Sequence, residues 1–110
     1  MASPQDFFAI DMRVGTVIEA EDFPEARKPS IKLVIDFGPD IGRKASSAQL
    51  MAHYSPSSLL GRQVVAAVNL GARRIAGFSS EVLVLGGMPT ETEVVLLALE
   101  RPVANGTRIG

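Results

Sequence analysis

Short segments of alternating apolar residues, separated by turns rich in Gly and Pro, constrain the fold of this chain most strongly. In the clearest one, residues 31–37, every second position is apolar: Ile31, Leu33, Ile35 and Phe37. Alternation with a period of two is the pattern of a half-buried β-strand. The next five residues, Gly38-Pro39-Asp40-Ile41-Gly42, predict the turn of a hairpin.

Further strands are expected on both sides of this one. Residues 12–20 predict an earlier strand, in which Gly15 indicates a bulge or sharp bend. Residues 43–49 predict a polar third strand and residues 63–70 a very apolar fourth strand. Residues 81–85 and 94–99 predict further buried strands, with a turn at Gly86-Gly87-Met88-Pro89 between them. The expected apolar face of the first strand is Val14, Thr16, Ile18 and Ala20.

Two short helices are expected. Ser3 is suited to cap a helix over residues 5–10, with Pro4 at its first position. Ser55-Pro56 and Gly61 likewise mark the start and stop of a single helical turn between the third and fourth strands.

This order of elements predicts an all-β fold, a closed five-stranded barrel with a short helix between strands 3 and 4. That is the order of the oligonucleotide/oligosaccharide-binding (OB) fold. A β-sandwich is the alternative, and the inserted helix favours the barrel. The length of 110 residues predicts one domain over residues 1–110.

The composition argues against catalysis. There is no cysteine, and the single histidine, His53, has no acidic residue near it in sequence, so we interpret it as a surface residue beside a turn. No phosphate-binding Gly-rich loop occurs. We therefore expect a non-enzymatic protein with no metal, cofactor or small-molecule substrate. No apolar run approaches the roughly 20 residues of a membrane span, and the N-terminus lacks signal-peptide features, so we expect a cytoplasmic protein without membrane insertion.

Charge is distributed unevenly along the chain. The net charge is −1, yet residues 41–80 contain no Asp or Glu. A basic surface formed by this stretch would attract anions, and polyanion binding requires such a patch. Its basic residues are Arg43, Lys44, Arg62, Arg73 and Arg74.

The connection between the fourth strand and the next apolar segment is the strongest candidate for binding. Arg73 and Arg74 can form bidentate bonds to phosphate, and an exposed Phe78 can stack on a base. The alternative is a solvated Arg-Arg turn with Ile75 and Phe78 in the core. Arg27-Lys28 is either a second basic point near the barrel mouth or an ordinary loop beside Glu25.

An ordered set of motifs resembles the tRNA-binding OB domain found alone and appended to some aminoacyl-tRNA synthetases. The resemblance implies a tRNA-binding surface on which Lys44, Arg73 and Arg74 contact phosphates, while Asn69 and Ser80 add neutral hydrogen bonds. The motifs are Arg13-Val14-Gly15, Phe23-Pro24-Glu25-Ala26, Lys32-Leu33, Tyr54-Ser55-Pro56, Asn69-Leu70 and Arg73-Arg74-Ile75-Ala76-Gly77.

A closer resemblance is to the CsaA branch of this family, stand-alone proteins described as export-related chaperones. It is carried by residues 73–86, by Ser46-Ser47-Ala48-Gln49 and by the ending Asn105-Gly106-Thr107-Arg108-Ile109-Gly110. The resemblance implies short N- and C-terminal extensions that build a homodimer, and no catalysis.

Two positions depart from the tRNA-binding pattern. Ala76 stands where the family usually has a basic residue, and Val82-Leu83 stands where it tends to have Gly-Met. The lost phosphate contact argues against high-affinity tRNA binding. The CsaA resemblance, and apolar residues beside basic ones in the 73–80 loop, imply a chaperone for unfolded or export-bound polypeptides, with Phe78 holding client side chains. A structure-selective tRNA-binding protein is the alternative. In a third interpretation, the 73–80 loop is a dimer contact and the protein a scaffold.

Overall fold

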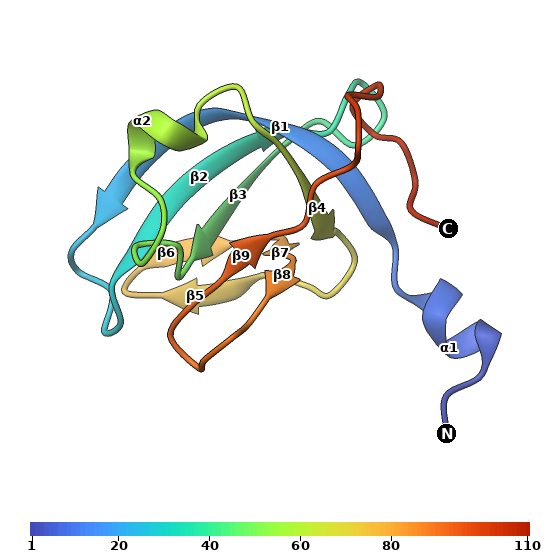
Figure 1. The fold of residues 1–110 in the computed structure, drawn as a ribbon, viewed down its shortest axis with the longest axis horizontal. Helices are drawn as coiled ribbons and strands as arrows, with labels where there is room; N and C mark the ends of the chain where they lie inside the picture. The colour runs from blue at the N-terminus through green and yellow to red at the C-terminus, as the bar shows by residue number, and fades with distance from the viewer.

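The main element of the fold is a curled five-stranded antiparallel sheet with the strand order β3-β2-β1-β4-β7, seen in a computed structural model that describes residues 1–110 (Figure 1). Helix α2 (Pro56–Leu59) lies between β3 and β4, which confirms the predicted OB-type order. Helix α1 (Pro4–Ala9) projects away from the barrel. The five strands are β1 (Met12–Phe23), β2 (Ser30–Asp36), β3 (Arg43–Ala48), β4 (Gln63–Ala67) and β7 (Leu83–Val84).

The barrel closes where residues 80–82 lie against β3. The Glu81 N–H donates to Ala45 O at 2.8 Å, and the Ala45 N–H donates to the Glu81 carboxylate at 2.9 Å. The Ser47 N–H donates to Ser80 Oγ at 3.0 Å. Side chains therefore satisfy N–H groups that an open edge strand would leave unpaired. We call this contact the closing seam.

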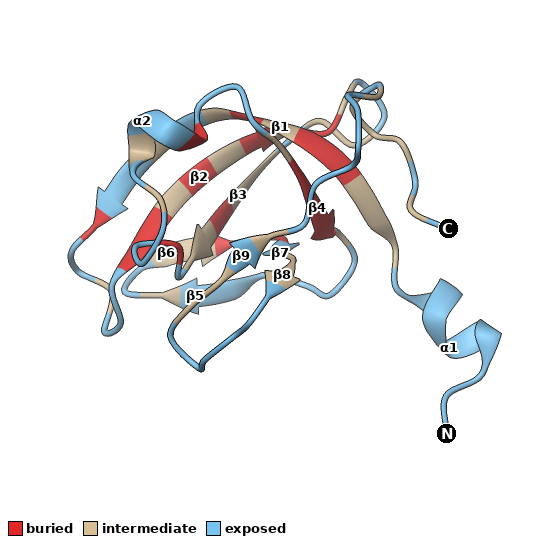
Figure 2. Ribbon diagram, in the orientation of Figure 1, coloured by how far each residue is buried: buried red, intermediate tan, exposed pale blue.

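The core lies inside the curled sheet, and its buried bands run across β1 to β4 (Figure 2). The predicted apolar face of residues 31–37 is confirmed, because all four of its side chains are at most 1% exposed. Leu59 of α2 is fully buried and covers one end of the barrel. Ser55 caps α2 and Ser3 caps α1, each with Pro at the start of its helix, as predicted. Neither helix combines the length and apolar character required to cross a membrane.

The prediction for the first strand is wrong in two respects. The register with β2 shifts between Val17 and Glu19, so the bulge lies at Ile18 and not at Gly15. Because the bulge adds one residue, Val17 faces the core in place of the expected Thr16 and Ile18, while Ala20 packs against the core as predicted. The absence of a side chain at Gly15 serves close packing instead.

The second half of the chain contains shorter strands than expected. β4 ends at Ala67, and the expected strand 81–85 is reduced to β7. The expected turn at Gly86-Gly87 is wrong, since β8 (Gly86–Gly87) pairs with β9 (Val95–Leu96) in a separate ribbon. A Cβ on Gly86 would lie 2.6 Å from Val95 O, so glycine is needed there for close strand approach. The expected burial of 94–99 is also wrong, because Leu97 is 49% exposed.

The C-terminal segment packs along the outside of β1. The Val14 N–H donates to Thr107 O, and the Gly106 N–H donates to Val14 O at 2.8 Å. Arg13 links this segment to Asp11, donating to Gly106 O at 3.0 Å and to the Asp11 carboxylate at 2.7 Å. The hydrogen bond from Arg13 lowers the pKa of Asp11 below its ordinary value.

Substitution of Gly15 by Ala should destabilise the barrel. The added Cβ would lie 2.6 Å from Ile35 Cγ2 and 2.7 Å from Phe37 Cδ1, both in the packed core. Overpacking of this kind costs about 1–3 kcal/mol. Urea unfolding of Gly15→Ala measures the loss. Gly87→Ala is the matched control, because its Cβ would meet nothing closer than 4.0 Å. Equal stability of the two variants would contradict the packing argument.

Candidate binding surface

A two-stranded hairpin carries the predicted arginines. β5 (Arg73–Ile75) pairs with β6 (Phe78–Ser80), where the sequence indicated only a connection. Ala76 and Gly77 form its two-residue turn with φ of 46° and 81°, the signs of a type I′ turn. Ala76 is the one non-glycine residue with positive φ, a conformation that L-residues with a Cβ adopt at a cost. We call this element the arginine hairpin.

Arg73 and Arg74 project from the hairpin without partners in the chain. Both are exposed, and neither guanidinium forms an ion pair or side-chain hydrogen bond. Ile75 on the same strand is only partly buried. The two cationic groups are therefore available to carboxylates or phosphates.

Phe78 matches neither of the two interpretations considered from the sequence, an exposed stacking ring or a core residue. It is partly buried, and its ring packs edge-on against Phe23, with 5.5 Å between centroids. The Lys32 ammonium lies 4.5 Å from the Phe23 ring centroid and 5.1 Å from that of Phe78. Phe78 thus forms one wall of a surface site and is neither fully exposed nor in the core.

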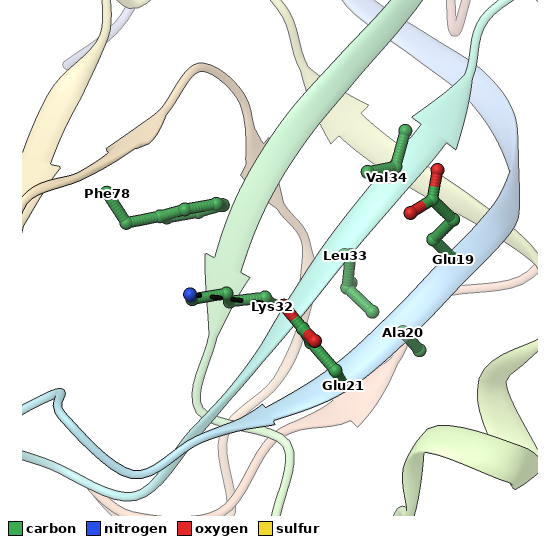
Figure 3. A pocket seen from close by; sticks show the side chains of 7 residues that line it. All are labelled: Glu19, Ala20, Glu21, Lys32, Leu33, Val34 and Phe78. Carbon is green, nitrogen blue, oxygen red and sulfur yellow. Dashed lines mark ion pairs between the residues drawn. The ribbon is translucent and has the colours of Figure 1, made fainter.

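A shallow pocket of about 140 Å³ has Phe78 among its lining residues (Figure 3). Glu19 and Glu21 come from β1, Lys32 from β2, and Phe78 closes the site from the hairpin. The Lys32 ammonium lies 3.9 Å from the Glu21 carboxylate. The floor is completed by Ala20, Leu33 and Val34. We call it the aromatic–acidic pocket.

Two of the predicted site residues use their polar groups inside the chain. The Asn69 amide accepts from the Asp11 N–H at 2.8 Å and donates to Ala9 O at 2.9 Å. Ser80 is 8% exposed, and its hydroxyl accepts the Ser47 N–H in the closing seam. The bonds of Asn69 position α1, and the bond of Ser80 positions the arginine hairpin. Both side chains therefore have structural roles.

The remaining predicted residues are spread over the barrel. Lys44 pairs with the inward-facing Ile35, so it lies on the inward face of β3, as Ser46 does. Arg43 pairs with Asp36 and lies on the outward face of the sheet, as Lys32 does. Arg27 and Lys28 are exposed in the β1–β2 loop. Arg27 lines a second hollow, of about 410 Å³, with Phe23, Pro24 and Met51 among its other walls.

Sequence reasoning missed Glu19, Glu21 and Lys32 as site residues because it sought a surface for anions, at Arg27-Lys28 and in the basic stretch 41–80. Alternation in β2 had placed Lys32 on the outward face, which was a usable signal. No sequence signal placed Glu19, since its orientation depends on the bulge at Ile18.

Comparison with known proteins decides the family. A model described as "Putative tRNA binding domain" matches residues 12–108. The chain superposes on the crystal structure of chaperone CsaA from Bacillus anthracis str. Ames with a TM-score of 0.95 and 53% identity, covering 100% of this chain and 99% of the other. The chain is a CsaA-type member of the tRNA-binding domain family. The predicted resemblance is thereby confirmed.

Other relatives agree with this assignment. The CsaA chaperone protein of Picrophilus torridus is 44% identical, with a TM-score of 0.91 and 100% coverage of both chains. The methionine–tRNA ligase of Methanocaldococcus jannaschii is 32% identical over 100 residues, which are 91% of this chain. This CsaA-type chain spans only 15% of the length of that ligase.

Proposed function

We propose that this protein is a dimeric molecular chaperone that holds unfolded or export-bound polypeptides in the cytoplasm, with residues 1–110 acting as one domain. The end-to-end similarity to a protein called a chaperone carries the proposal, because it extends over the whole chain at 53% identity. In support, the candidate surface offers cationic, aromatic and carboxylate groups side by side, a combination suited to binding a polypeptide.

The arginine hairpin and Phe78 suit an extended polypeptide. Exposed guanidinium groups at Arg73 and Arg74 attract client carboxylates, and the Phe78 ring provides an apolar surface for client side chains. The grooves of small barrels accept extended chains generally. Two such surfaces in a dimer would raise avidity for a long client without new contacts.

We propose the N-terminal helix as part of the dimer interface. α1 buries none of its residues, and Phe7, Phe8 and Ile10 are 43%, 52% and 42% exposed. Hydrogen bonds tie it to the barrel: Asn69 donates to Ala9 O at 2.9 Å, and Arg108 donates to Phe8 O at 3.2 Å. An N-terminal segment that exposes three large apolar side chains gains stability when a partner covers them.

Binding of tRNA is the second candidate function. The family model is that of a putative tRNA binding domain, and methionine–tRNA ligases carry a related segment. The unpaired Arg73 and Arg74 suit phosphates as well as carboxylates. Ala76 offers no charge at the tip of the hairpin, where the family pattern has a basic residue.

The chaperone proposal predicts that micromolar protein suppresses aggregation of a chemically unfolded client, measured by light scattering. Phe78→Ala should weaken binding of short unfolded peptides about three- to tenfold, because one aromatic wall is lost. Fluorescence anisotropy measures the affinity. Leu60→Ala, which removes a 53% exposed apolar side chain at the C-terminal end of α2, is the control. A wild-type protein without suppression would contradict the proposal.

The dimer proposal predicts a solution mass of two chains at micromolar concentration. Phe8→Asp should shift the protein to a single-chain mass, since a carboxylate would be buried without a partner in the interface. Light scattering after size exclusion gives the mass. Leu60→Asp, an equivalent change outside the interface, should leave the mass of two chains. A monomeric wild type would refute the interface.

If tRNA is a ligand, replacing both hairpin arginines should flatten the salt dependence of binding. Two lost phosphate contacts reduce the slope of log affinity against log salt by about 1.4–1.8. Filter binding of tRNA to Arg73→Ala/Arg74→Ala across a salt series tests this. Arg101→Ala removes an exposed charge from the C-terminal segment as a control. An unchanged slope would exclude these arginines as phosphate contacts.

A further inference from the structure

We propose that the aromatic–acidic pocket is a subsite for the basic side chain, Lys or Arg, of an extended polypeptide. The proposal rests on the proposed chaperone function and adds a client preference to it. It concerns Glu19, Glu21, Lys32 and Phe78, which form a site separate from the guanidinium groups of Arg73 and Arg74.

The β1 bulge creates the acidic side of the pocket. In an unbroken strand Val17, Glu19 and Glu21 would share one face, and Val17 faces the core. The extra residue at Ile18 reverses this, so Glu19 pairs with Val34 and Glu21 with Lys32, both on the outward face. Bulges commonly re-aim side chains in this way next to functional sites.

The charges in the pocket do not balance. Glu21 is paired with Lys32 at 3.9 Å, whereas Glu19 has no ion pair or side-chain hydrogen bond in the chain. Two carboxylates and one ammonium leave a formal excess of one negative charge in a partly enclosed site. A cationic guest would neutralise that excess, and an anionic guest would increase it.

The position of Lys32 shows independently that the rings of Phe23 and Phe78 accept a cation. Its ammonium already lies over both phenyl rings, 4.5 Å and 5.1 Å from their centroids, while its side chain remains 28% exposed. Aromatic faces attract cations through their quadrupole. A client Lys or Arg would find the same combination of ring and carboxylate between Phe78 and Glu19.

The pocket favours a polypeptide over RNA as the source of the guest. Phosphates approaching Phe78 would meet the Glu19 and Glu21 carboxylates, and this repulsion opposes stacking of a nucleotide there. A polypeptide can instead place a basic residue in the pocket and an acidic residue against Arg73 or Arg74. The two sites together would select segments of mixed charge.

The test uses two fluorescent unstructured peptides, identical except for one central residue, Lys or Gln. We expect the full-length protein to bind the Lys peptide about three- to tenfold more tightly, the range for one partly exposed cation–π and ion-pair contact. Glu19→Gln should abolish that preference, and Glu100→Gln, the same change in the C-terminal segment, should leave it intact. Lys32→Met should increase it, because the internal competitor is removed.

The outcomes distinguish failure of the subsite from failure of the proposed chaperone function. Equal affinity of wild type for both peptides, or a preference that survives Glu19→Gln, overturns the subsite and leaves the chaperone proposal standing. Failure to bind either peptide, together with no suppression of aggregation, overturns both. Thermal unfolding of each variant confirms that its fold is intact, and Glu19→Gln decides the case alone if Lys32→Met does not fold.

Discussion

The closing seam between β3 and residues 80–82 is the contact on which the rest of the structure depends. It converts an open antiparallel sheet into a barrel, and it does so with side-chain acceptors, Ser80 Oγ and the Glu81 carboxylate, in addition to main-chain groups. Unpaired strand edges promote association with other chains, and the seam protects the edge of β3 from such pairing. The arginine hairpin leaves the barrel directly from this seam.

A second constraint, the bulge at Ile18, decides what the outer face of β1 presents. It allows β1 to pair with β2 on one side and β4 on the other while changing which residues face inward. Val17 remains in the core, and the acidic residues that follow it turn to the surface. The seam places the arginines of β5 on one side of Phe78, and the bulge places the glutamates of β1 on the other. The surface around Phe78 therefore carries both positive and negative charges.

Local signals made much of the fold predictable. The alternation of β2, the Gly38–Gly42 turn and the Ser-Pro starts of both helices depend on residues close in sequence. The bulge position, the β8–β9 ribbon and the internal bonds of Asn69 depend on partners distant in sequence, and a single sequence does not encode these visibly. The charge pattern directed attention to Arg73 and Arg74 and missed the acidic side of the pocket, which lies outside the basic stretch.

The separation of the two sides of the seam along the chain has a consequence for folding. β1, β2 and β3 pair as consecutive hairpins, whereas Ala45 and Glu81 are 36 positions apart. Contacts that close long loops carry a larger entropy cost and tend to form after local ones. We therefore expect the meander to form early and the arginine hairpin to dock late. The surface proposed to receive unfolded chains would then be among the last parts of this chain to fold.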